Sequence, residues 1–149
     1  MTPDEARLMA DKIRQVGPLN ELARKEINLT GGEASQNPHV VEIFEIFKTL
    51  SSNVRLHTNL DIKSEKSKRW ARLEEITKRR GRIDITLYPT VWESRQKPLL
   101  KKIIQLQDGL IVNLIYETLT DLLSQINILS DFFNEQGAEK FHPVLGLLG

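Results

Sequence analysis

The order of apolar and polar residues predicts a chain made mostly of helices. Thr2 and Glu5 have the spacing of a capping box, and apolar residues then recur at helical spacing as far as Val16. A second, shorter helix is expected over 19–27. Asn37-Pro38 predicts the start of a third helix, because an amide cap followed by proline suits a helix N-terminus.

The second half of the chain carries a basic helix and a long apolar stripe. Residues 64–80 predict the basic helix, and residues 82–88 alternate polar and apolar positions, which is typical of a short extended segment. Residues 54–62 suit a helix and an extended chain equally. Over 98–136 the apolar residues keep helical spacing, which indicates one long helix or a helical hairpin that turns at Asp108-Gly109.

Together these patterns predict an all-α fold, a bundle of about five to seven helices with a long C-terminal helix or helical hairpin and one short extended segment near 82–88. The length is that of a single domain spanning 1–149. Small polar residues predict an exposed loop over 29–37. Proline and glycine predict that 141–149 is an irregular apolar tail.

The composition limits the setting and the chemistry. The chain contains no cysteine, which excludes disulfides and thiolate chemistry and favours an intracellular location, in the cytoplasm or the nucleus. The sequence shows neither a signal-peptide pattern nor an apolar run long enough to span a membrane. The net charge of +1 hides a basic middle, since residues 55–102 hold 14 Lys and Arg against 6 Asp and Glu while both flanks are acidic.

The basic segment 63–82 is the first candidate binding site. A cluster of cations suits an acidic protein partner, the phosphates of a nucleic acid or an anionic membrane surface. It equally suits a solvated helix face. The candidate partner-binding or nucleic-acid-binding residues are Lys63, Lys66, Lys68, Arg69, Arg72, Lys78, Arg79, Arg80 and Arg82.

The apolar stripe within 98–136 is the second candidate, a helix interface. A helix that is apolar on more than one face has to be buried, either inside its own domain or against another chain, which includes a second copy of this one. The candidate interface residues are Leu110, Leu114, Leu119, Leu122, Ile126, Leu129 and Phe133.

The sequence contains no recognisable motif for catalysis, cofactor binding or metal binding. His39, His57 and His142 lack the close spacing of zinc ligands. Gly31-Gly32 lacks the flanking residues of a phosphate-binding loop, and no nucleophile motif surrounds any serine. We therefore expect no catalytic residues, no cofactor, no metal and no small-molecule substrate.

Apolar spacing over 47–103 forms one further pattern, carried by Phe47, Leu50, Leu60-Asp61-Ile62, Ser67-Lys68, Leu73, Ile76 and Leu99-Leu100. In this pattern the stretch resembles the helical modules at the N-terminus of transcription elongation factor S and in the integrase-binding domain of chromatin-tethering proteins. The resemblance implies a bundle that binds short disordered peptides. The extended segment and the long C-terminal helices depart from it.

These observations predict a non-enzymatic helical protein–protein interaction module, either a scaffold or a subunit of a larger complex. Its partner would bind through helices 98–136 and the basic segment 63–82, and self-association would use the same apolar helices. The alternative is a nucleic-acid-binding domain, associated with chromatin or RNA, that uses the basic helix.

Overall fold

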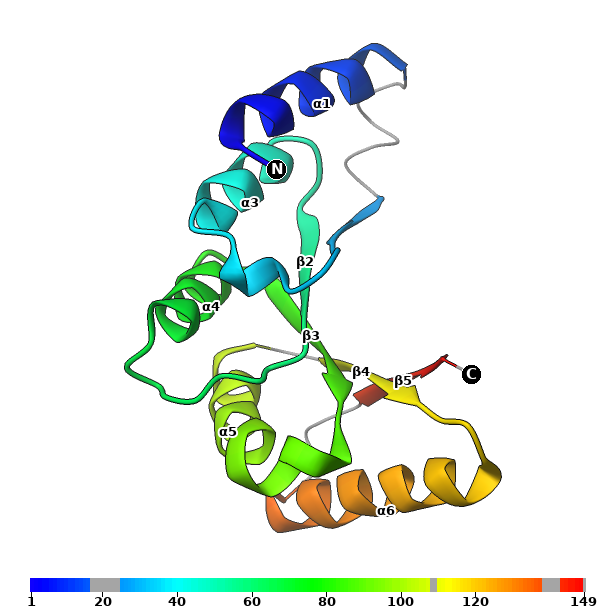
Figure 1. The fold of residues 1–149 in the computed structure, drawn as a ribbon. Helices are drawn as coiled ribbons and strands as arrows, with labels where there is room; N and C mark the ends of the chain where they lie inside the picture. The colour runs from blue at the N-terminus through cyan, green and yellow to red at the C-terminus, as the bar shows by residue number, and fades with distance from the viewer. Residues whose placement is uncertain (17–24, 108–109, 138–142, 149) are drawn as a thin grey trace.

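The computed structural model describes residues 1–16, 25–107, 110–137 and 143–148. They form a mixed α/β fold in which one five-stranded parallel sheet is combined with helices (Figure 1). The prediction of an all-α bundle is therefore wrong, and so is the bundle implied by the resemblance. Several apolar runs that fit helical spacing are buried strands, because periodicity alone does not separate a short buried strand from a helix.

The strands of the sheet lie in consecutive order, each parallel to the next. One row of aligned residues runs across the sheet through Thr58, Ile85, Val112 and Leu145. The strands are β1 (Glu26–Leu29), β2 (Asn53–Thr58), β3 (Arg82–Leu87), β4 (Leu110–Ile115) and β5 (Pro143–Leu148).

The helices are α1 (Pro3–Val16), η1 (Ala34–Gln36), α3 (Val40–Lys48), α4 (Lys68–Lys78), η2 (Pro89–Val91), the π-helical turn η3 (Trp92–Gln96), α5 (Lys97–Leu106) and α6 (Leu119–Glu135). Crossovers between parallel strands are right-handed, and because every crossover here steps in the same direction, the helices lie on one face of the sheet. Figure 1 shows α3, α4, α5 and α6 following that side. The other face, called here the helix-free face, carries no helix among the described residues.

Several sequence predictions are confirmed. Thr2 and Glu5 form the capping box of α1: the Thr2 amide donates to the Glu5 carboxylate at 2.6 Å, and the Glu5 amide donates to Thr2 Oγ1 at 3.3 Å. α3 follows Asn37-Pro38, and α4 occupies the basic segment with Ser67 as its N-cap. The extended segment near 82–88 is β3, in the middle of the sheet.

The prediction of a long helix or hairpin over 98–136 is wrong. α5 ends at Leu106, β4 follows, and α6 begins after Thr118. Thr118 and Asp121 exchange side-chain and backbone hydrogen bonds in a capping box, which makes this a separate helix start. The intervening apolar run pairs with β3 and β5, so its backbone bonds are made to other strands rather than within a helix.

Four shorter expectations are also corrected or limited. Of the helix predicted over 19–27, residues 19–24 lie outside the described residues and its end overlaps β1. The ambiguous stretch 54–62 contains most of β2. The expected loop 29–37 contains η1. Of the irregular tail expected over 141–149, residues 141, 142 and 149 lie outside the described residues, and the rest is β5.

The hydrophobic core fills the space between the sheet and its helices. Leu56 and Ile83 of the sheet are buried there with Phe44 of α3 and Trp70 of α4. Gly81 is required where α4 runs into β3, since a Cβ at this position would lie 2.4 Å from an Ile76 methyl carbon and 2.6 Å from the Phe44 ring. Because its side chain is buried in this core, Trp70 is a core residue.

The β–α unit recurs regularly, with strands that begin at residues 26, 53, 82, 110 and 143. The intervals between successive starts are 27, 29, 28 and 33 residues, so the structure repeats a β–α unit with one longer spacing. Consecutive parallel strands with helices on one face are found in (β/α) barrels and in β/α solenoids, where the helix-free face is the concave one. Among the described helices, none has both the length and the apolar character needed to cross a membrane.

Candidate functional site

The helix-free face of the sheet carries a row of polar side chains from four neighbouring strands. Side chains alternate along a strand, so the residues between the buried apolar positions point to this face. Because the strands are aligned in register, these side chains lie close together. The members of this polar row are Glu26, Arg55, His57, Asp84, Thr86 and Asn113.

His57 connects three strands in the carboxyl-terminal half of the polar row. Its Nε2 lies 2.7 Å from Thr86 Oγ1, and Asn113 Nδ2 lies 3.3 Å from its Nδ1. With the Asn113 amide assigned as donor to Nδ1, the neutral imidazole carries its proton on Nε2 and donates it to Thr86. His57 and Asn113 are half-buried, so this part of the row is open to a ligand.

Arg55 holds an ion-pair network in the amino-terminal half of the row. Its Nε donates to Glu26 at 2.7 Å and its Nη1 donates to Asp84 at 2.8 Å. Arg55 and Asp84 are only 8% and 6% exposed. Burial raises the pKa of Asp84 above its ordinary value, and the attraction of Arg55 offsets this only in part. Burial also acts to raise the pKa of Glu26, but hydrogen bonds from Asn28, Arg55 and Asn53 outweigh it and leave that pKa lowered.

Glu33 fixes the loop after β1 to the end of β2. Its carboxylate accepts hydrogen bonds from Thr58 Oγ1 at 2.6 Å, from the Asn59 amide at 2.8 Å and from Ser35 Oγ at 2.5 Å. Arg69 Nη2 lies 3.5 Å from the same carboxylate. A carboxylate with this many donors is satisfied by the protein itself, so Glu33 holds the loops at the carboxyl edge of the sheet.

Gln96 links the ends of β2 and β3 in a similar way. It is fully buried, and its Nε2 donates to the carbonyls of Asn59 at 2.6 Å and Thr86 at 2.8 Å, while its Oε1 accepts from the Tyr88 amide at 2.9 Å. Gln96 ends the π-helical turn η3, a rare conformation that occurs frequently at functional sites. Two buried side chains therefore order the loops around the carboxyl edge.

Left-handed backbone occurs in both loops that Glu33 joins. Gly31 and Gly32 have φ values of 113° and 53°, and no atom lies within 4 Å of where their Cβ atoms would be. Leu60, although not a glycine, has a φ of 52° and is buried. Glycine adopts this conformation without strain, whereas Leu60 pays an energetic cost that its burial and the surrounding contacts offset.

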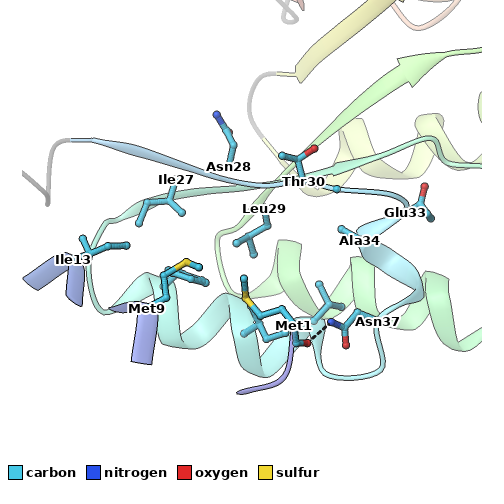
Figure 2. A pocket seen from close by; sticks show the side chains of 14 residues that line it. Met1, Met9, Ile13, Ile27, Asn28, Leu29, Thr30, Glu33, Ala34 and Asn37 are labelled. Carbon is cyan, nitrogen blue, oxygen red and sulfur yellow. Dashed lines mark hydrogen bonds between the residues drawn. The ribbon is translucent and has the colours of Figure 1, made fainter. Parts of the chain in front are cut away.

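An apolar hollow of about 320 Å³ lies between α1, β1 and α3, on the helix side of the sheet (Figure 2). Met9, Ile13 and Leu29 lie around the same space in this view. Asn37 is among its polar lining residues, and its side-chain amide already donates to the Met1 carbonyl at 2.8 Å. This hollow is separate from the polar row.

The structure separates the basic residues that were predicted to form one site. Arg69 and Arg72 face η1, where they donate to the Ser35 hydroxyl and carbonyl, each at 3.1 Å. Arg79 pairs with Glu45 at 3.2 Å. Arg69 and Arg72 therefore support the fold, whereas the ion pair of Arg79 lies on the surface and contributes little to stability. The members with exposed side chains are Lys63, Lys66, Lys68, Lys78, Arg79, Arg80 and Arg82.

The predicted helix interface is divided between β4 and α6, and most of it is core. Leu119 faces solvent, with 70% of its surface exposed. The others pack inside the domain, which accounts for their apolar character without a partner. The buried members are Leu110, Leu114, Leu129 and Phe133, and the half-buried ones are Leu122 and Ile126.

The polar row and the two bridging side chains were missed in the sequence, although a signal for the row exists. Val54 to His57 alternates apolar and polar residues, and Ile83 to Thr86 repeats that alternation one structural unit later. Two such segments predict adjacent parallel strands with one polar face. Among the described residues, no group of three or more His, Asp or Glu side chains gathers to hold a metal ion.

No protein-family model matches the chain, and no curated protein matches it. Its fold and the geometry of the polar row are the features that characterise it. These define a parallel β/α domain with a polar, helix-free sheet face and ordered loops at its carboxyl edge.

Proposed function

We propose that the protein is a ligand-binding β/α domain that holds a small polar molecule over His57, Thr86 and Asn113. The observation that carries the proposal is the meeting of these side chains from three neighbouring strands on the helix-free face. Parallel β/α sheets bind ligands at the carboxyl ends of their strands. An imidazole, a hydroxyl and an amide offer donors and acceptors, which suits a ligand rich in hydroxyl, amide or heterocyclic groups.

The proposal replaces the expectation of no small-molecule substrate, which depended on the absence of recognisable motifs in the sequence, because the polar row forms only when separate strands pair. Binding rather than catalysis is proposed, and the intracellular setting, in the cytoplasm or the nucleus, remains a prediction.

Replacing His57 by phenylalanine tests the proposal. We expect small polar compounds that bind the protein to shift the amide resonances of residues around Thr86 and Asn113 in NMR spectra. His57→Phe should weaken the binding of these compounds at least about tenfold, since it removes two hydrogen-bonding atoms. His39→Phe is the matched control, because His39 is exposed at the start of α3. Ligands that bind elsewhere, or that His57→Phe leaves unaffected, would contradict the proposal.

A second candidate is the protein–protein interaction module or complex subunit, favoured by exposed apolar side chains around the start of α6. Leu119 and Leu123 lie one helical turn apart, and Ile115 ends the adjacent β4; all three side chains are exposed. Exposed apolar clusters of this kind mark interaction surfaces.

This second candidate predicts self-association or partner binding through α6. We expect light scattering to show a mass above that of the monomer, and Leu119→Ser with Leu123→Ser to restore the monomer without loss of helical signal, because neither side chain contributes to the core. Leu8→Ser, at an exposed leucine of α1, is the control. A monomeric wild-type protein that captures no partner would reject this candidate.

A further inference from the structure

A second hollow, of about 350 Å³ and with a more polar lining than the first, lies between the loop after β2 and the turn η3. Both segments follow the carboxyl ends of their strands, so the hollow belongs to the same edge of the sheet as the proposed ligand site. Its volume falls in the range of small-molecule pockets. Lys63, Ser64 and Lys66 line it from the loop, and Ser94 and Arg95 line it from η3.

The charges at this hollow are predominantly positive. Arg95 pairs with Asp61, and Glu65, the acidic residue in the lining, pairs with Lys102. No hydrogen bond or ion pair joins the side chains of Lys63 and Lys66 to another described residue. The two salt bridges cancel their own charges, so Lys63 and Lys66 leave an excess of two positive charges.

The position of Arg95 is fixed by the fold. The π-helical turn that carries it ends at buried Gln96, whose side chain is bonded to the ends of β2 and β3. The ion pair with Asp61 holds the guanidinium beside the loop after β2. One anchored guanidinium, two unpaired ammonium groups and two hydroxyls are the donors that phosphate oxygens prefer.

We infer that this hollow binds the phosphate group of a small phosphorylated molecule. The inference deepens the proposed function and rests on it for the place of the ligand: the phosphate lies among Lys63, Lys66 and Arg95. The apolar part of the lining consists of Ile62, Pro98 and Leu99, and the organic part of the ligand would pack against it. A carboxylate ligand is less well matched, because it presents fewer oxygens to a ring of donors.

Calorimetric titration of the full chain with inorganic pyrophosphate at low salt tests the inference. We expect saturable binding that weakens at least about tenfold in Lys63→Ala/Lys66→Ala and weakens with added salt in the wild type. The matched control is Lys12→Ala/Lys78→Ala, which removes the same charge from exposed sites on α1 and α4. Equal binding by the two double variants, or no saturable binding by the wild type, would overturn the inference.

Two further arms separate the alternatives. A short single-stranded RNA that binds more tightly than pyrophosphate, and that requires Lys68, Arg80 and Arg82, would overturn the inference in favour of a nucleic-acid surface. His57→Phe separates this site from the proposed ligand site. Pyrophosphate binding that survives His57→Phe, in a protein with no polar ligand at His57, supports the anion site and rejects the proposed function. Polar ligands that bind at His57 in a protein that does not bind pyrophosphate would support the proposed function and reject the anion site.

Discussion

Replacing Glu33 by alanine is expected to lower the free energy of unfolding by about 3 kcal/mol, since it leaves several buried donors without an acceptor at roughly 1 kcal/mol each. The donors that lose their partner are Thr58 Oγ1, the Asn59 amide and the Ser35 hydroxyl. Urea unfolding measures the change, with an unaltered slope against urea as evidence that the variant still folds in two states.

Two variants make the Glu33 prediction specific. Glu33→Gln keeps the size and one acceptor oxygen, so we expect its free energy of unfolding to lie between those of the wild type and the alanine variant. Glu93→Ala removes an exposed glutamate whose contact with Lys97 is 3.4 Å, and should change stability by less than about 0.5 kcal/mol. An equal effect of Glu33→Ala and Glu93→Ala would show that the carboxylate does not hold the carboxyl edge.

Local patterns in the sequence predicted those elements whose signals are local. The capping box at Thr2 and Glu5, the start after Asn37-Pro38 and the alternation over 82–88 each specify one element within a few residues. All three are present in the structure. Helix caps and apolar–polar alternation depend only on neighbouring residues, so they can be identified from a single sequence.

The fold class was missed because strand pairing is not a local property. β4 has the sequence LIVNLI, which fits a buried strand and a buried helix equally. What decides between them is the presence of β3 and β5 on either side, which begin 28 residues before and 33 residues after the start of β4. An extended segment at 82–88 needs partner strands, and in the structure Val54 to Thr58 of β2 and β4 supply them.

The residues of the site were harder to predict than the fold, because the register of the paired strands is what brings them together. His57 meets Thr86 and Asn113 only because β2, β3 and β4 are parallel and adjacent. In the basic segment the opposite happens: cations that are close together in the sequence are separated in the structure, because they lie on a loop, a helix and a strand. Lys63 and Lys66 share a hollow with Arg95, which lies outside the predicted segment.

Arg55 and Asp84 give the other large expected effect. Replacing Arg55 by methionine should destabilise the protein by about 3 kcal/mol at pH 7, because it leaves the buried Asp84 carboxylate without its cation. Arg82→Met is the control, since Arg82 is exposed on the same face and should contribute less than about 0.5 kcal/mol. The double variant Arg55→Met/Asp84→Leu removes both charges and should recover most of the loss.

The destabilisation by Arg55→Met is expected to shrink as the pH falls. Burial already raises the pKa of Asp84 in the folded protein, and the loss of Arg55 raises it further. A carboxyl group whose folded pKa exceeds its unfolded value binds its proton more tightly in the folded state. Its protonation therefore stabilises the fold fully below the unfolded pKa, about 3.9, and this stabilisation is lost as the pH rises through the folded pKa.

Glu26 acts in the same direction on the difference between the two proteins. Its lowered pKa stabilises the wild type above the unfolded pKa, about 4.3, and this contribution is lost only as the pH falls below that value and through the folded pKa. Arg55→Met removes one of the hydrogen bonds that lower it, so the variant has less to lose. Between pH 7 and about pH 5 the change comes from Asp84, so urea unfolding should give a smaller gap at pH 5, and Glu26 should narrow it further only at lower pH. A gap that is constant with pH would mean that the methionine variant fails through packing, and that the buried charge of Asp84 is not the cause.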